Sequence, residues 1–199
     1  MAESPVAGVI EPRASAQPVR PAPASRIERA WAVLATVPDP EVPAVSVCDL
    51  GIVRDVIVSG AGSGDGVEGD ALEIVLTPTY SGCPATEAIA ADVVAALDAA
   101  GLGPARVTLR RAPAWTSDWI SAEGRTKMLI YGIVPPGPAR ADGAVPMRFL
   151  GRGLAAPRLA CPRCGSTDTE RLAVFGSTAC KSTWRCLACR EPFEQFKAI

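Results

Sequence analysis

The chain has 199 residues, of which 48% are hydrophobic, and its formal net charge is −1. This length accommodates one domain of average size and a smaller one, and the apolar content excludes a wholly disordered chain. No apolar run approaches the roughly 20 residues that span a bilayer, and the amino terminus lacks the basic start and apolar block of a signal peptide. We therefore expect a cytoplasmic protein whose seven cysteines serve metal ligation or thiol chemistry rather than disulfides.

The small net charge conceals two parts of opposite sign. Residues 1–146 carry 11 basic and 17 acidic side chains, whereas residues 147–199 carry nine basic and four acidic ones. An acidic amino-terminal part is a poor ligand for nucleic acid, but the basic carboxyl-terminal part leaves such binding open.

The amino-terminal third begins without periodic structure. Residues 1–24 contain five prolines and neither a helical nor a strand period, which predicts a disordered tail. A helix is expected to begin after the N-cap Ser25, with its apolar side chains on one face, and to stop before Pro38. Pro40 and Pro43 then favour extended chain, because they lack backbone donors and bias the preceding residues away from helix.

Two β-branched apolar runs predict neighbouring strands at residues 51–60 and 71–78, joined by a glycine-rich loop. This loop contains Gly64-x-Gly66-x-x-Gly69, which matches a dinucleotide-binding fingerprint. The fingerprint requires a strand before it and a helix after it. Because a strand follows here, we predict no nucleotide site.

The next elements alternate between helix and strand. An apolar face from Pro84 to about Ala100 predicts a helix, residues 105–115 read as a third strand, and residues 117–132 read as helical in one or two pieces, with Ser117 as the cap and Gly132 as the stop. Residues 134–156, rich in Pro, Gly and Ala, predict a linker. The expected fold class is therefore α+β: a small α/β domain of helix, three-stranded sheet and helix, with a helical extension, over residues 25–133, and a second domain over residues 157–199.

Four cysteines in two C-x2-C pairs dominate the second domain. They are Cys161, Cys164, Cys186 and Cys189, with 21 residues between the pairs. This spacing is typical of a structural zinc ribbon, in which a hairpin brings two knuckles together into a tetrahedral site. Four thiolates leave no open coordination position, so we expect a structural zinc; an iron site with the same ligands is the alternative. So small a domain would depend on the metal for its stability.

A single cysteine, Cys83, lies between the second predicted strand and a helix that starts at Pro84. This order places Cys83 at about the N-cap, where free helix N–H groups and the helix dipole lower a thiol pKa. The chain has no histidine, so a Cys-His nucleophile is excluded. A thiolate there suits iron, an iron–sulfur species or thiol exchange, and a buried residue closing the turn is an equally good interpretation.

The remaining candidates are less specific. Asp39 and Glu41 lie in extended chain and are interpreted from local sequence as turn or cap residues. Cys48 lies in an apolar strand entry and is interpreted as a core residue. Cys180, between the two knuckles, is interpreted as a small residue without a ligand role.

Two sequence stretches resemble known families. "DPEVPAVSVCDLGIVRDV" and "TPTYSGCPATEAI" resemble the small α/β domain of SufT-type iron–sulfur assembly factors. "WTSDWISAEGRTKMLIYGIVPP" and the four-cysteine segment are similar more narrowly to the PaaD (PaaJ) family, the D subunits of bacterial phenylacetyl-CoA epoxidase systems. The resemblance covers about residues 26–136 and 157–199, and it includes neither the glycine-rich loop nor the linker.

The resemblance implies a SufT-like first domain followed by an all-cysteine zinc ribbon, in a protein of phenylacetate catabolism. In such systems a di-iron oxygenase receives electrons from a flavin and iron–sulfur reductase and epoxidises the ring of phenylacetyl-CoA. Members of the family are implied to be non-catalytic accessory subunits that assemble or mature an iron–sulfur cluster, with the reductase as their main partner. The resemblance also implies that Cys83 is the functional thiol, holding iron or a cluster transiently, with Asp39 and Glu41 as its neighbours.

Two alternatives from other functional classes remain open. The basic carboxyl-terminal part allows a nucleic-acid-binding zinc ribbon, although no interleaving of aromatic and basic residues supports it, and we expect no nucleic-acid or membrane partner. A thiol oxidoreductase that uses Cys83 is the other alternative, and it lacks a resolving cysteine at C-x-x-C spacing.

Overall fold

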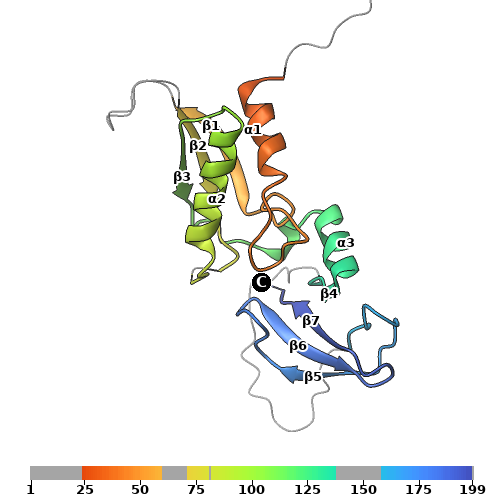
Figure 1. Cartoon of the computed structure of the whole chain (residues 1–199). Helices are drawn as coiled ribbons and strands as arrows, with labels where there is room; N and C mark the ends of the chain where they lie inside the picture. The colour runs from red at the N-terminus through yellow and green to blue at the C-terminus, as the bar shows by residue number, and fades with distance from the viewer. Residues whose placement is uncertain (1–23, 60–70, 81, 138–157, 199) are drawn as a thin grey trace, which may run out of the picture.

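The computed structural model of the chain describes residues 24–59, 71–80, 82–137 and 158–198 (Figure 1). Of the sequence-based expectations, nearly all of the amino-terminal tail, the glycine-rich loop with its fingerprint-like glycines and most of the linker lie outside these residues. The described part has the expected α+β class, with two sheets. None of its helices is both long and apolar enough to cross a bilayer.

The first sheet has the strand order β1-β2-β3 and contains the strands expected from the sequence. They are β1 (Val53–Ser59), β2 (Ala71–Leu76) and β3 (Ala105–Leu109). β1 pairs with β2 antiparallel, whereas β3 pairs with β2 parallel after the crossover helix α2 (Thr86–Ala99). β3 is shorter than the expected 105–115, because its partner β2 ends at Leu76 and leaves no further strand to pair with.

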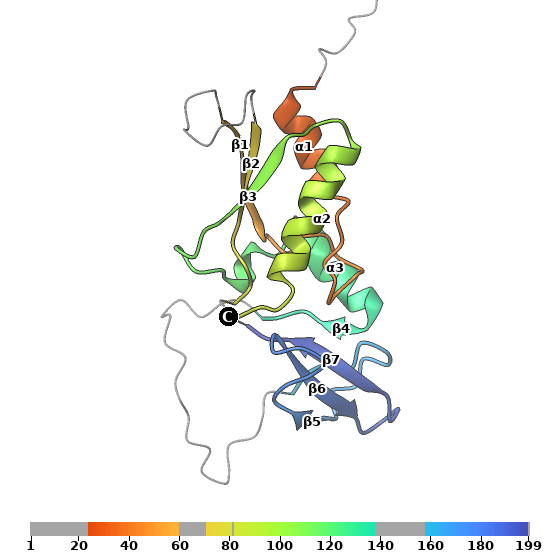
Figure 2. The same ribbon diagram turned by 60° about the vertical axis from the view of Figure 1, so that its left-hand side comes forward.

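Helices α1 (Arg26–Leu34) and α2 cover one face of this sheet, which Figure 2 shows from the side. The predicted cap Ser25 is confirmed: its hydroxyl accepts from the backbone N–H of Glu28, and the Glu28 carboxylate accepts from the N–H of Ser25. Such a capping box satisfies two orphan donors of the first turn. The core between sheet and helices contains Leu34, Ile74 and Val93, all fully buried.

The helical extension forms two pieces, a 3-10 turn at Ser117–Trp119 and helix α3 (Ala122–Tyr131). Thr116 and Ser121 cap them through their hydroxyls, so the expected cap at Ser117 is wrong by one residue for the first piece. Gly132 ends α3 with a φ of 96°, as expected from its position, since a left-handed cap favours glycine.

The second sheet has the order β4-β7-β6-β5. Its strands are β4 (Ile133–Val134), β5 (Thr169–Ala173), β6 (Lys181–Cys186) and β7 (Pro192–Phe196). β5 and β6 form the hairpin expected between the knuckles. β7, which the sequence analysis did not include, pairs antiparallel with β6 and parallel with β4. The sheet of the ribbon is thus completed by a strand at the expected boundary between the first domain and the linker.

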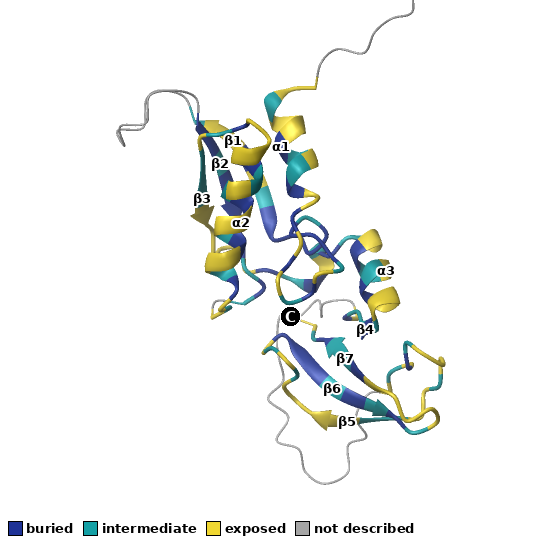
Figure 3. Ribbon diagram, viewed as in Figure 1, coloured by how far each residue is buried: buried dark blue, intermediate teal, exposed yellow. Residues whose placement is uncertain are grey.

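The two units pack against each other at the end of the first sheet from which α2 starts, with the ribbon below it in Figures 1 and 2. The rings of Trp115 and Phe196 lie with their centroids 6.0 Å apart, and Phe196 and Cys180 belong to the same buried cluster as the residues under α1 and α2. Figure 3 shows most of β6 as buried, including its first residues, which lie next to this junction. The ribbon is therefore docked on the first domain.

Candidate metal centre and thiol cavity

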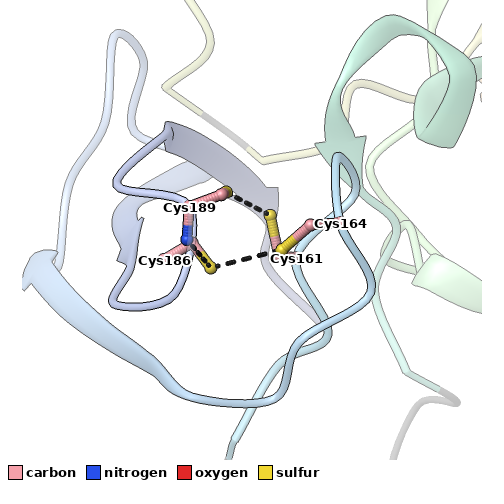
Figure 4. A group of neighbouring side chains, drawn as sticks. All are labelled: Cys161, Cys164, Cys186 and Cys189. Carbon is pink, nitrogen blue, oxygen red and sulfur yellow. Dashed lines mark hydrogen bonds between the residues drawn. The ribbon is translucent and has the colours of Figure 1, made fainter.

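The structure brings the four knuckle cysteines together (Figure 4). The sulfurs of Cys161 and Cys189 lie 3.7 Å apart, those of Cys164 and Cys186 lie 3.6 Å apart, and all four fall within 4.8 Å of one another. A tetrahedron with metal–sulfur bonds of about 2.3 Å has edges of about 3.8 Å. The donor set and its spacing therefore fit one tetrahedral metal ion.

Local turns hold these sulfurs in place. The backbone N–H of Arg163 donates to the Cys161 sulfur over 3.4 Å, and the N–H of Cys189 donates to the Cys186 sulfur over 3.5 Å. The second of these bonds is the main reason that the pKa of Cys186 is lowered to about 7. Gly165 follows the first knuckle with a φ of 74°, which a side chain would strain. The backbone donor thus favours a thiolate at Cys186, whereas at Cys189 a backbone hydrogen bond is outweighed by burial and the three neighbouring thiols, which raise the pKa.

A second site lies at the junction of the two units. It is a cavity of about 20 Å³, which we call the junction cavity. Cys83, Asp39 and Glu41 line it from the first domain, and Cys180 and Phe196 line it from the ribbon. The structure therefore groups all three candidate residues of the first domain around one cavity and adds a second cysteine to them.

Cys83 is not at the N-cap of α2. The helix begins at Thr86, Ala85 occupies the cap position without a side-chain hydrogen bond, and Cys83 lies in the preceding turn, where its N–H donates to the Tyr80 carbonyl over 3.2 Å. Burial, followed by the nearby charges of Glu41 and Asp39, outweighs the hydrogen bonds that Cys83 receives and raises its pKa. The expectation of a thiolate-like Cys83 is thus wrong: at neutral pH without a bound cation this half-buried thiol is protonated.

Asp39 shapes the loop that forms one wall of the cavity. Its Oδ1 atom accepts from the backbone N–H groups of Glu41 over 2.9 Å and of Val42 over 2.8 Å. Burial is the largest influence on this carboxyl and raises its pKa against the effect of the two donors. The interpretation of Asp39 as a turn residue therefore matches its contacts, and these contacts also fix the position of Glu41.

Glu41 and Cys180 meet across the domain boundary. The Cys180 sulfur lies 3.6 Å from Oε2 of Glu41, and the Thr178 hydroxyl lies 3.0 Å from the same sulfur. Cys180 is buried, with 5% of its surface exposed, and burial raises its pKa to about 11. The neighbouring Lys181 ammonium contacts the Glu41 carbonyl over 3.3 Å and the Glu194 carboxylate over 3.2 Å.

The sequence analysis missed Cys180 as a site residue. It lies outside both C-x2-C pairs, and nothing in its local pattern indicates that the ribbon docks with this residue toward Cys83. The other unassigned thiol, Cys48, packs against the core as expected, and burial raises its pKa to about 11.

Two protein families match the chain, one in each of its two parts. A family described as "Iron-sulfur cluster assembly protein" matches residues 27–109, and a family described as "PaaD zinc beta ribbon domain" matches residues 149–197. Among solved structures, a DUF59 domain of unknown function from Bacillus anthracis is 26% identical, with a TM-score of 0.44, and the match covers 52% of this chain and 91% of that one. A conserved hypothetical protein from Thermotoga maritima is also 26% identical, with a TM-score of 0.39 and coverage of 50% and 89%.

One curated relative spans both units. An Escherichia coli (strain K12) protein, provisionally named as the D subunit of 1,2-phenylacetyl-CoA epoxidase, is 40% identical over 174 residues, which are 87% of this chain and 94% of the relative. Identity at this level over nearly the whole relative, together with the PaaD ribbon match, establishes the family. The chain belongs to the PaaD family of phenylacetyl-CoA epoxidase proteins.

Proposed function

We propose that this protein is a non-catalytic accessory subunit of a phenylacetyl-CoA epoxidase system, and that it assembles or matures the iron–sulfur cluster of the flavin-containing reductase. The name of the Escherichia coli relative supports the epoxidase system, and the iron–sulfur assembly match over residues 27–109 supports the maturation role. The reductase is the partner because, in such a system, it is the component that carries the cluster.

The junction cavity is the observation that carries this proposal. Cys83 lies within the segment that matches iron–sulfur assembly proteins, is partly accessible, and faces a cavity with two carboxylates beside it. Thiolates and carboxylates are ligands that iron accepts. A cavity this small holds about one water-sized sphere, which suits delivery of an ion and is too small for an organic substrate.

The four knuckle cysteines support a structural role for the second metal site, and we assign zinc to it. Four thiolates complete a tetrahedral shell, so the ion has no open position for a reacting molecule. Its role is to fold the ribbon, and the ribbon in turn places Cys180 and Phe196 at the junction cavity.

A thiol oxidoreductase is the second candidate, because Cys180 supplies the resolving thiol that the sequence around Cys83 lacks. Exchange between thiols and disulfides requires a thiolate. Burial raises the pKa of both thiols, and nearby carboxylates add to this effect. The raised pKa values disfavour exchange at neutral pH, whereas a bound cation can displace the thiol protons, and the Glu41 carboxylate 3.6 Å from the Cys180 sulfur offers such a cation a further ligand.

The test is coexpression of the reductase with the wild-type protein or with single variants. We expect Cys83→Ser to leave the purified reductase with little cluster iron and sulfide, while Cys48→Ser, which changes a partly buried thiol outside the cavity, leaves wild-type occupancy. Both variants should retain the zinc content of the wild type. Full cluster occupancy with Cys83→Ser would contradict the proposed function.

A further inference from the structure

We propose that Cys180 of the ribbon is a metal ligand, and that it joins Cys83 and Glu41 in holding one Fe²⁺ ion as cargo in the junction cavity. This inference rests on the proposed function and deepens it, because it names the species carried and a ligand from the second domain. Two thiolates and one carboxylate would then come from three separate segments of the chain.

The fold fixes Cys180 at this position. The residue immediately precedes β6, and its carbonyl accepts from the N–H of Lys197 over 2.8 Å, which ties it to the end of β7. Its sulfur lies 3.6 Å from the Glu41 carboxylate, and the cavity that it lines is the one that Cys83 lines from the other domain. The cavity is thus completed only when the ribbon docks.

Charge also favours a cation here. Asp39 uses Oδ1 for two backbone donors and serves to position the loop, so Glu41 is the better ligand of the two carboxylates. The Lys181 ammonium also acts electrostatically on Cys180 and Asp39, but it pairs with the Glu194 carboxylate, which offsets its charge, and its contact with Glu41 is to the carbonyl. The Glu41 carboxylate is half-buried beside the Cys180 thiol, and a divalent ion bound there would balance its charge.

The size of the cavity decides how much metal it can take. About 20 Å³ is room for a single water-sized sphere, so a preformed multi-iron cluster does not fit. Binding of Fe²⁺ would replace the two thiol protons, which pass to solvent, and it requires no change of oxidation state.

The junction cavity differs from the knuckles in the distances between its ligand atoms. Within the described part of the chain, the four knuckle cysteines are the one group that brings three or more metal-ligand atoms within 4.8 Å of one another. The junction donors must therefore move toward an ion to bind it. Because that closure costs free energy, the ion is held less tightly than in the knuckles, as a cargo ion must be.

The experiment titrates Co²⁺ into the zinc-loaded full-length protein without oxygen. Co²⁺ binds such sites more tightly than Fe²⁺, and its thiolate charge-transfer absorption scales with the number of bound sulfurs. We expect one Co²⁺ per chain with absorption for two thiolates, about half that absorption in Cys180→Ser and in Cys83→Ser, and at least about tenfold weaker binding in both. Glu41→Gln should weaken binding while keeping the two-thiolate absorption, and Cys48→Ser should match the wild type.

Zinc content and the thermal unfolding midpoint establish that each variant is folded. If Cys180→Ser unfolds the ribbon, the other two variants still test the inference. The two-thiolate absorption must persist in Glu41→Gln, and it must fall by half in Cys83→Ser. Wild-type affinity and absorption in a folded Cys180→Ser protein would overturn the inference, and so would failure of the wild type to bind Co²⁺ beyond its zinc.

The two proposals can fail separately. If Cys83→Ser empties the reductase of its cluster while Cys180→Ser binds Co²⁺ normally, the proposed function stands and the ligand assignment is wrong. If both thiols bind Co²⁺ but the reductase keeps its cluster in the presence of Cys83→Ser, the ion site stands and the maturation role is wrong.

Discussion

Cysteine side chains form the knuckle site and also line the junction cavity, but the two groups of thiols are brought together differently. The knuckle sulfurs come from two tight turns of one small sheet and lie 3.6 to 3.7 Å apart in each close pair. The thiols of the junction cavity come from two domains, and tertiary packing alone brings them to the same place. Short-range turns build the four-sulfur site, whereas docking of the two units brings the thiols of the junction cavity together.

The electrostatic surroundings of the knuckle thiols and the cavity thiols also differ. In the knuckles a backbone N–H that points at the Cys186 sulfur lowers its pKa to about 7. At the junction, burial and the Glu41 charge raise the pKa of Cys180 to about 11, against the bond from Thr178. The backbone donor therefore favours a thiolate at Cys186, whereas burial raises the pKa of Cys83 and of Cys180 and keeps these cavity thiols protonated at neutral pH.

Removing the knuckle metal should have the largest effect. A structural zinc site of this kind contributes about 10–16 kcal/mol of apparent binding free energy, most of which is folding free energy of its domain. We expect a strong chelator to abolish amide-exchange protection in β6 while leaving protection in β2. Amide hydrogen exchange followed by mass spectrometry measures both.

The same experiment tests the dependence of the cavity on the ribbon. Because Cys180 and Phe196 line the cavity from the ribbon, chelation should also increase the alkylation rate of Cys83, with Cys48 as an internal control. Retained β6 protection after complete zinc removal would show that the ribbon folds through its docking surface rather than through its metal.

Truncation of Asp39 should have an intermediate effect, confined to the cavity. Asp39→Ala leaves the N–H groups of Glu41 and Val42 without their acceptor, and an unsatisfied buried donor costs about 1–3 kcal/mol. We expect urea unfolding to show a loss in this range, and weaker Co²⁺ binding because Glu41 is released.

Asp39→Asn is the matched control, since its amide oxygen can still accept both bonds. It should retain most of the stability and of the Co²⁺ affinity. If Asp39→Asn lost Co²⁺ binding as fully as Asp39→Ala, the negative charge of Asp39 would be needed at the site, and its role as a positioning residue would be wrong.

The pH dependence should show the smallest effect. Cys48 and Cys180 have folded-state pKa values raised to about 11 from an ordinary value of 9.0. Their neutral forms are favoured by folding, so this contribution is complete below pH 9 and is lost as the pH rises from about 9 to 11. The slope is at most about 1.4 kcal/mol per pH unit for each thiol, because each thiol exchanges at most one proton.

Denaturant unfolding of the zinc-loaded protein between pH 8 and about 11 measures this slope. The variants Cys48→Ala and Cys180→Ser should each remove part of this loss. The four knuckle thiols contribute a slope of opposite sign up to about pH 9, because they take up protons when unfolding releases the zinc, and this contribution is common to the wild type and both variants. An unchanged slope in both variants would show that these two thiols already titrate as exposed groups.

Sequence reasoning recovered the features that depend on neighbouring residues. Ser25 and Gly132 marked helix ends correctly, and the two C-x2-C pairs marked the knuckles, because capping and tight turns require particular residues at fixed short spacings. The same local reasoning placed Cys83 at a helix cap, and an additional turn, in which the Thr86 N–H donates to the Cys83 carbonyl over 3.2 Å, moved it outside the helix.

The features that depend on docking could not be predicted in this way. Cys180 lies far from Cys83 along the chain, and the docking of the ribbon, which includes the packing of Phe196 against Trp115, places the two thiols at one cavity. β4 has two residues and no periodicity to detect, so its pairing with β7 is visible only once the ribbon is in position.

The pairing of β4 with β7 holds the parts of the chain before and after residues 138–157 in one sheet. Residues 138–157 connect two points of one packed body, because β4 before them already belongs to the sheet that follows them. Doubling the length of such a connection costs only about 0.6 kcal/mol in closure entropy. A chain cut within residues 138–157 should therefore yield two fragments that remain associated and copurify. The same assembly could be encoded as two separate polypeptides.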